Sequence, residues 1–147
     1  MRPAVFVPAV WNGAVPDRVY HATAAGFFPK FDLARSCGVI WFMPDRQEAR
    51  DTALSFARFQ RGPSPVVYEC RLTLEKIARF NSEDDIYEFG SQHTPKRDRQ
   101  DVLSAASAGL FAAGYDGLVD LYHNDGIRIS LGALKIEAIE IVARDII

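Results

Sequence analysis

The 147-residue sequence has few cysteines, and they form no pattern that would link a fold or bind a metal. Cys37 and Cys70 stand far apart, in neither a CxxC pair nor a zinc-ligand spacing. We therefore expect reduced, partly buried thiols and a cytoplasmic protein. Long apolar runs are also missing, so we expect neither a signal peptide nor a membrane span. If the protein acts in another cell, other machinery must deliver it.

The sequence also has no excess of positive charge. Its 17 Lys and Arg against 19 Asp and Glu give a net charge of −2, which provides no general attraction to nucleic acid or to an anionic membrane. The motifs GxxxxGK[ST], GxGxxG and GxSxG are absent, which argues against ordinary kinases, Rossmann dehydrogenases and α/β-hydrolases. The apolar content of 48% is that of a soluble globular protein, and the length suits one domain.

Short apolar runs bounded by Gly, Asn or Asp predict most of the strands. The clearest is Pro65–Leu74, where apolar and polar side chains alternate. The other predicted strands are Tyr20–Thr23, Gly38–Met43, Leu118–Leu121, Ile127–Leu131 and Ile136–Val142.

Two helices are predicted from caps and periodicity. The first begins at Asp45, with Glu48 completing a capping-box pattern, and its apolar face is Ala49, Ala53, Phe56 and Ala57. The second covers about Asp101–Ala113, with Leu103, Ala106, Leu110 and Ala113 as its buried face and Gly114 as its stop. Asn81–Gln100 has poor periodicity and is interpreted as a partly helical excursion or a mobile loop. The sequence therefore predicts an α+β fold in which two or three helices flank a small mixed or antiparallel sheet assembly.

Two strand-like segments bring together polar and aromatic side chains. Val19–Thr23 carries a histidine and a hydroxyl, and Gly38–Phe42 carries two large aromatics. Together they suggest a pocket for a flat, ribose-bearing ligand, with NAD as the leading candidate. Taken alone, His21 is either a core histidine or a ligand-binding one. Trp41 and Phe42 point to opposite faces of their strand, so only one of them can line a pocket.

The order of these motifs resembles the ADP-ribosyltransferase fold in its histidine-type branch, shared by diphtheria-like toxins, poly-ADP-ribose polymerases and many small phage or toxin domains. The resemblance covers roughly residues 18 to 142. It implies that residues 1–147 form one ADP-ribosyltransferase-like domain whose split sheet clamps NAD. The segments that carry it are Tyr20–Thr23, the Phe27, Phe28 and Phe31 stretch, Gly38–Phe42 running into Asp45–Arg50, Val67–Leu72, Gly114–Val119 and Lys135–Ile139.

The resemblance also implies roles for individual residues. His21 would hydrogen bond a ribose hydroxyl, the backbone of Ala22 would hold the nicotinamide amide, and Thr23 would contact the ribose. Trp41 stands where the family has a tyrosine that stacks on the nicotinamide, and Phe56 would form a second aromatic wall. Ala22 stands where the family usually has a glycine after the histidine, and its side chain slightly narrows the space for the ligand.

Cleavage of the nicotinamide–ribose bond develops positive charge on the sugar, which a carboxylate must stabilise. The family places a glutamate at the start of a late strand, but that position falls near Ile127 or Arg128, and neither is acidic. A carboxylate displaced from that position would serve instead, with Asp120 as first choice and Asp125 second.

Two alternatives to a displaced carboxylate stay open. In the first, Tyr122 or Gln92 fills the position of the missing glutamate and the enzymatic activity is lower. In the second, the domain has lost the transfer of ADP-ribose and has kept only a binding surface. Asp116, between Tyr115 and Gly117, is interpreted as a turn carboxylate that holds backbone amides rather than as a catalyst.

The resemblance therefore implies an NAD-dependent ADP-ribosyltransferase or NAD glycohydrolase, with His21 and Asp120 as catalytic residues. NAD would be a substrate, and ADP-ribose would pass to water or to a macromolecular acceptor, a protein in preference to nucleic acid. We expect no metal and no membrane association, and we expect an inhibitory partner protein. The alternative is an inactive module of the same fold that binds a protein or nucleotide. RNA 2′-phosphotransferase chemistry is disfavoured because only Arg18, Arg35 and Arg128 lie near the right strands.

Overall fold

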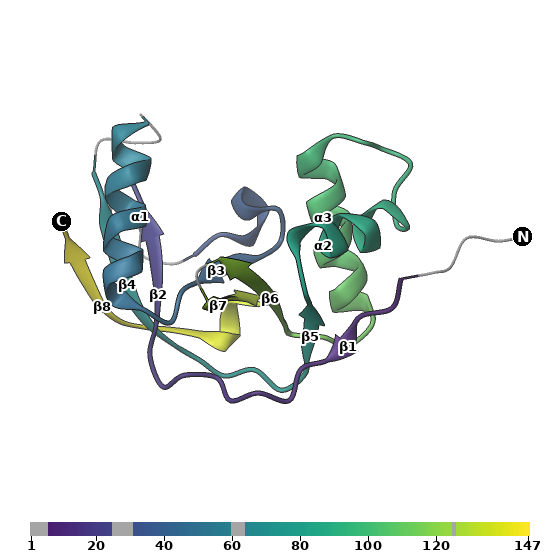
Figure 1. Ribbon diagram of the computed structural model, residues 1–147, viewed down its shortest axis with the longest axis horizontal. Helices are drawn as coiled ribbons and strands as arrows, with labels where there is room; N and C mark the ends of the chain where they lie inside the picture. Colours follow the sequence, from purple (N-terminus) through teal and green to yellow (C-terminus); the bar gives the residue numbers. More distant parts are fainter. Residues whose placement is uncertain (1–5, 25–30, 60–63, 125) are drawn as a thin grey trace, which may run out of the picture.

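The computed structural model describes residues 6–24, 31–59, 64–124 and 126–147, without the side chains of residues 122–128. Eight strands form two separate sheets (Figure 1). One sheet has five strands in the order β1-β5-β6-β7-β3, and the other is antiparallel, in the order β2-β4-β8. The strands are β1 (Ala9–Val10), β2 (Val19–Thr23), β3 (Ile40–Phe42), β4 (Val66–Leu72), β5 (Ile77–Phe80), β6 (Gly117–Asn124), β7 (Gly126–Ala133) and β8 (Ile139–Ile146).

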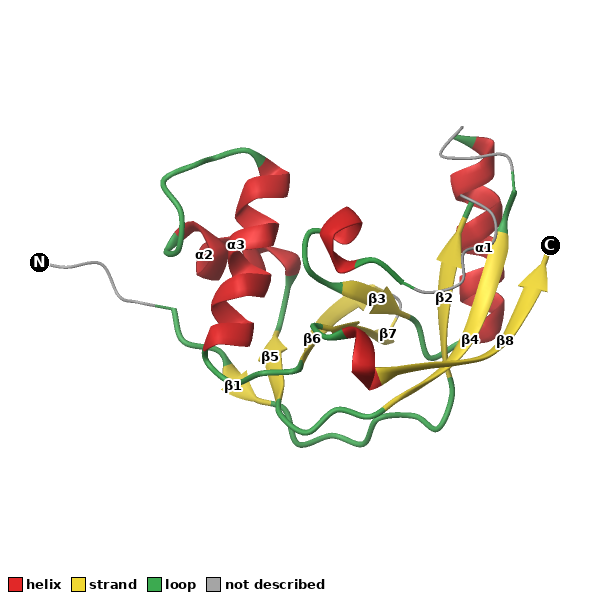
Figure 2. Ribbon diagram, turned by 180° about the vertical axis from the view of Figure 1, so that it is seen from behind, coloured by secondary structure: helices red, strands yellow, loops and turns green. Residues whose placement is uncertain are grey.

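Three α-helices flank the sheets, as the predicted α+β class requires. They are α1 (Arg46–Arg58), α2 (Glu83–Ser91) and α3 (Arg99–Ala112), with short 3-10 helices η1 (Leu33–Ser36) and η2 (Ile136–Ala138). Figure 2 shows α1 beside the three-stranded sheet and α2 and α3 at the other end of the molecule. Within the described residues, no helix combines the length and the apolar character that crossing a bilayer requires.

Three apolar clusters hold these layers together. The largest lies between the two sheets and includes Tyr68, Phe42 and Leu131. A second packs α2 and α3 against the five-stranded sheet, and a third packs α1 against β2 and β4. The strands β3, β5, β6 and β7 therefore have one face toward the other sheet and one toward α2 and α3, whereas both residues of β1 are exposed.

The first helix forms as predicted. Asp45 is its N-cap, and the side chain accepts a hydrogen bond of 3.0 Å from the backbone N–H of Gln47. Ala49 and Ala53 are fully buried, which lets the helix lie close to β2 and β4.

The predicted buried face of α3 is wrong in part. Val102, Ala106, Ser107 and Leu110 are the buried residues, whereas Ala113 is exposed. The face is rotated because α2 packs alongside α3 and covers Val102, a contact that the periodicity of α3 alone cannot show. Gly114 has a φ of +94°, as expected of the residue that ends the helix.

The segment predicted as a loop or partial helix contains α2. Ser82 caps it, its hydroxyl accepting from the backbone N–H of Asp85 at 3.3 Å, and Ile86 and Phe89 are buried against the sheet. The strand β5 was not predicted, and it pairs in parallel with β6. Parallel pairing needs a long crossover connection, and α2 and α3 provide it. The predicted strand Ile136–Val142 begins instead as η2, so β8 starts only at Ile139.

Asp116 is the backbone-holding carboxylate that the sequence predicts. Its Oδ2 accepts from the N–H of Glu75 at 2.8 Å and its Oδ1 from the N–H of Lys76 at 2.9 Å, and the side chain is buried. The carboxylate thereby ties the turn before β5 to the start of β6.

Both cysteines are free. Burial, followed by the charge of Glu69, raises the pKa of the Cys70 thiol to about 12. This thiol is therefore protonated and unreactive at neutral pH.

Candidate functional site

The His21 ring lies between the two sheets, where β2 and β3 separate. Its Nδ1 lies 2.7 Å from the main-chain oxygen of Trp41, and its ring meets Phe31 and Phe42 edge-on at centroid distances of 5.0 and 5.8 Å. These contacts place the His21 ring against the core cluster between the sheets, of which Phe31 and Phe42 are members.

The protonation state of His21 follows from these contacts. Burial lowers its pKa and outweighs the opposing effect of the hydrogen bond to Trp41, so the ring is neutral at pH 7. A carbonyl oxygen can only accept, so the single proton must lie on Nδ1. Nε2 then carries the lone pair and can accept a hydrogen bond, for example from a hydroxyl.

The other residues predicted from the first motif lie on two faces of β2. The alternation of the strand places Thr23 on the same face as His21. Ala22 faces α1, where its side chain packs in a cluster with Ala49 and Ala53. Phe56 packs against that same cluster, on the far side of the three-stranded sheet from the His21 ring. The structure therefore does not bring the Phe56 ring together with His21.

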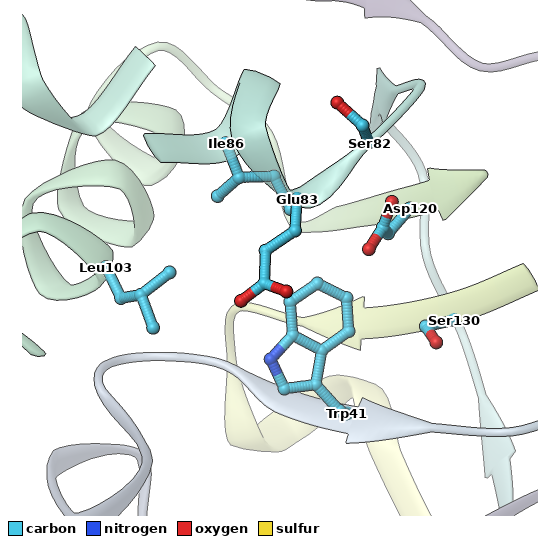
Figure 3. Close-up of a pocket in the computed structure, with 7 residues that line it drawn as sticks. All are labelled: Trp41, Ser82, Glu83, Ile86, Leu103, Asp120 and Ser130. Atoms are coloured by element: carbon cyan, nitrogen blue, oxygen red, sulfur yellow. The ribbon is translucent and has the colours of Figure 1, made fainter. Parts of the chain in front are cut away.

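A cavity of about 490 Å³ lies on the helix-covered face of the five-stranded sheet (Figure 3). Trp41 and Asp120 both line it, which brings together two of the residues predicted from the sequence. Figure 3 shows the indole and both carboxylates of the lining turned toward one space. The described residues that line it are Trp41, Ser82, Glu83, Ile86, Leu103, Asp120 and Ser130.

Strand pairing explains how these side chains meet. Asp120 on β6 lies opposite Ser130 on β7, and Trp41 on β3 lies opposite Gly132 of β7. Ile40 and Phe42, the neighbours of Trp41, face the other sheet, so the Trp41 indole must face α2 and α3. The main chain of Trp41 thus contacts His21 while its side chain lines the cavity on the opposite face of β3.

Asp120 is the most unusual group in the cavity. Its Oδ1 is buried, and no hydrogen-bond partner for this atom exists among the described parts of the chain. Burial first, and then the negative charges of Glu83 and Asp85, raise the pKa of the Asp120 carboxyl to about 6. A buried carboxylate oxygen without a partner costs stability, and such cost is typical of functional sites.

Glu83 is a cavity residue that the sequence motifs did not single out. It is the first residue of α2, and its Oε1 lies 2.6 Å from Nη2 of Arg99 at the start of α3. The hydroxyl of Tyr87 donates to the same oxygen at 3.3 Å. A capping serine followed by acidic residues, Ser82 to Asp85, was the available signal of a helix start, but nothing local indicated that this helix end would face Asp120.

Of the remaining candidates for the missing acid, only Gln92 has a described side chain, and it does not line this cavity. Gln92 is exposed at the far end of α2. Asp125 lies outside the described residues, as do Phe27, Phe28 and the side chain of Tyr122. In the part of the chain that is described, no three His, Cys, Asp or Glu side chains gather as they would to hold a metal ion.

The raised pKa of Asp120 predicts an effect on stability. The folded-state pKa of about 6 lies above the ordinary 3.8, so ionisation favours the unfolded state as pH rises from 3.8 to 6, and the full penalty is present above pH 6. Asp120→Asn is therefore expected to raise the free energy of unfolding at pH 8 by about 1–2 kcal/mol, less than the full shift would give because the side chain is partly open to solvent. Urea unfolding at pH 8 and pH 4 measures this gain, which should vanish at pH 4. Equal stability of variant and wild type at pH 8 would contradict it.

Comparisons with known proteins support the fold. No protein-family model matches the sequence, and no curated protein matches it. Among solved structures, a chain from the crystal structure of the M. tuberculosis MbcT–MbcA toxin–antitoxin complex is similar, with a TM-score of 0.55 and 10% sequence identity. The match covers 96% of this chain and 86% of that chain. At this identity the similarity shows a shared fold.

Proposed function

We propose that this protein is a toxin-like enzyme that cleaves the nicotinamide–ribose bond of NAD and passes ADP-ribose to a macromolecular acceptor or to water. The observation that carries the proposal is the cavity in which the Trp41 indole and the Asp120 carboxylate meet. An aromatic face suits the nicotinamide ring, and a carboxylate suits the positive charge that develops on the ribose as the bond breaks.

Asp120 is the proposed charge-stabilising group. With a pKa of about 6 it is mostly ionised at pH 7, and its buried oxygen is not engaged by another described group. A preorganised carboxylate in a partly dry cavity stabilises an oxocarbenium-like transition state more strongly than water does.

His21 has a proposed positioning role, because its hydrogen bond to the main chain of Trp41 links β2 to β3. The ribose contact that the resemblance implies would use Nε2, with Thr23 on the same face, and both side chains lie across β3 from the cavity that Trp41 and Asp120 line. The main chain of Tyr20 pairs with Met43, on the side of β2 away from β4. Strand alternation places the backbone groups of Ala22 along that same edge, where the resemblance has them hold the nicotinamide amide, but Ala22 is not among the described residues that line the Trp41 cavity. Phe56 has no place in this proposal.

The shared fold also suggests a biological setting. The similar chain comes from a toxin–antitoxin complex, so we propose that an inhibitory partner protein binds this chain.

Release of nicotinamide from NAD by the purified chain tests the proposal. If water is the acceptor, we expect the chain alone to release nicotinamide from NAD. If a protein is the acceptor, we expect labelled protein in an extract supplied with labelled NAD. If neither release nor labelling occurs while Trp41 and Asp120 are intact, the enzymatic proposal is wrong.

An inactive binding module remains the second candidate, and one observation favours it. The His21 ring is packed among core aromatics, and its side chain does not line the cavity with Asp120. This candidate predicts binding of NAD or of a fragment of it, measured by calorimetry, with no nicotinamide released.

A further inference from the structure

The cavity beside Trp41 has a charge that the proposed reaction does not by itself require. Among the described residues, seven side chains line it: two of these, Glu83 and Asp120, are carboxylic acids, and none of these seven is basic. The remaining lining is apolar or hydroxyl-bearing. The described lining therefore favours a positively charged group over a phosphate.

The position of Glu83 is defined by its neighbours. Arg99 holds Oε1 of Glu83 from outside, since the Arg99 side chain is 69% exposed and does not line the cavity. Tyr87 donates to the same oxygen and lies under the Arg99 guanidinium, 5.7 Å from ring centroid to Cζ. Both neighbours contact the carboxylate of Glu83, whose side chain is 53% exposed, and the ion pair with Arg99 offsets part of its charge.

Trp41 provides a surface for a flat cation. The indole face is the strongest aromatic partner for cations among protein side chains. Ile86 and Leu103 line the same cavity and suit the edge of a planar ring. A volume of about 490 Å³ leaves room for such a ring.

We propose that this cavity is selective for a positively charged planar ring, with the Trp41 indole as the stacking surface and the carboxylates of Glu83 and Asp120 as counter-charges. That the natural ring is the pyridinium of NAD rests on the proposed function, whereas the charge selectivity does not. The proposal adds Glu83 as a binding residue and places the pyrophosphate of a dinucleotide outside the cavity.

Calorimetry of the full chain at pH 8 and low salt tests the proposal with two ligands. The probes are 1-methylnicotinamide, which is a cation, and nicotinamide, which has the same ring and amide but no charge. We expect the cation to bind about tenfold more tightly or better. Equal or tighter binding of nicotinamide, or no detectable binding of the cation, overturns the proposal.

Two variants locate the selectivity. Glu83→Gln is expected to weaken binding of the cation by about fivefold and to leave nicotinamide within about twofold. Asp84→Asn is the matched control, because it removes the same charge from the next position of α2, where the side chain is exposed like that of Glu83 but does not line the cavity. Thermal unfolding confirms that each variant is folded. If Asp84→Asn weakens binding of the cation as much as Glu83→Gln does, the effect comes from the overall electrostatic field of the protein, and the proposed site is wrong.

The cation test and the test for nicotinamide release fail independently. Preference for the cation without NAD cleavage supports the charge-selective site and contradicts the enzymatic proposal. Cleavage of NAD by a chain that binds both ligands equally supports the enzymatic proposal and contradicts the charge-selective site.

Discussion

Asp120→Asn is expected to lower the rate of nicotinamide release from NAD by about a hundredfold or more, since a preorganised charge that stabilises a transition state contributes at least this much. The amide keeps the shape of the side chain and removes the charge. The same substitution is expected to stabilise the fold at pH 8, so loss of activity cannot be attributed to unfolding.

The pH dependence of the rate gives a second readout of Asp120. Protonation of the carboxyl removes the charge, so release by the wild-type chain should decline as pH falls below about 6, the pKa of Asp120. The residual activity of Asp120→Asn should not show this decline. Asp84→Asn is the control, since its exposed side chain lies outside the cavity. An Asp120→Asn rate equal to that of the wild type would exclude Asp120 as the acid while leaving the reaction itself intact.

Asp116→Ala is expected to lower the free energy of unfolding by about 2–4 kcal/mol. The substitution removes both acceptors that the N–H groups of Glu75 and Lys76 use, at 2.8 and 2.9 Å, and leaves two part-buried donors without partners. Urea unfolding at pH 7 measures the loss. Because these bonds join the turn before β5 to the start of β6, the loss should appear in global unfolding.

Two controls separate this effect from a general loss of charge. Asp116→Asn keeps one acceptor oxygen, so its loss should be about half as large. Asp17→Ala removes a carboxylate whose side chain is 83% exposed, and should change stability by less than about 0.5 kcal/mol despite its surface ion pair with Arg18. Stability of Asp116→Ala within this same margin would show that the two amides find water instead.

Features that depend on neighbours in the chain could be predicted from the sequence. The cap at Asp45 and the alternation along β4 are confirmed, because each depends on residues close to one another in the chain. The α+β class is confirmed for the same reason, since it depends on the kinds of element present rather than on how they pair. The amide-holding role of Asp116 is also confirmed, but the amides belong to Glu75 and Lys76, which lie 41 and 40 residues earlier and which the turn pattern does not indicate.

Features that depend on pairing between distant segments could not be predicted from the sequence. β5 is only four residues long, and its parallel partner β6 lies beyond two helices. The buried face of α3 is set by its contact with α2, which the sequence presents as an irregular, charged segment. Such contacts depend on loop closure and packing, and they leave no periodic pattern in the chain.

The two motifs that suggest an NAD-binding pocket show the same division. The sequence by itself determined the residue types, namely a histidine and a hydroxyl on one strand, an aromatic pair on another, and an aspartate on a third. Only the tertiary structure decided which of them share a space. The pleat of β3 turns Trp41 toward α2 and Asp120 while its carbonyl contacts His21, and the crossover between β5 and β6 brings Glu83 to the same cavity. Strand alternation is local, but which layer covers each face is decided by long-range packing, and that packing places the charge of the candidate site.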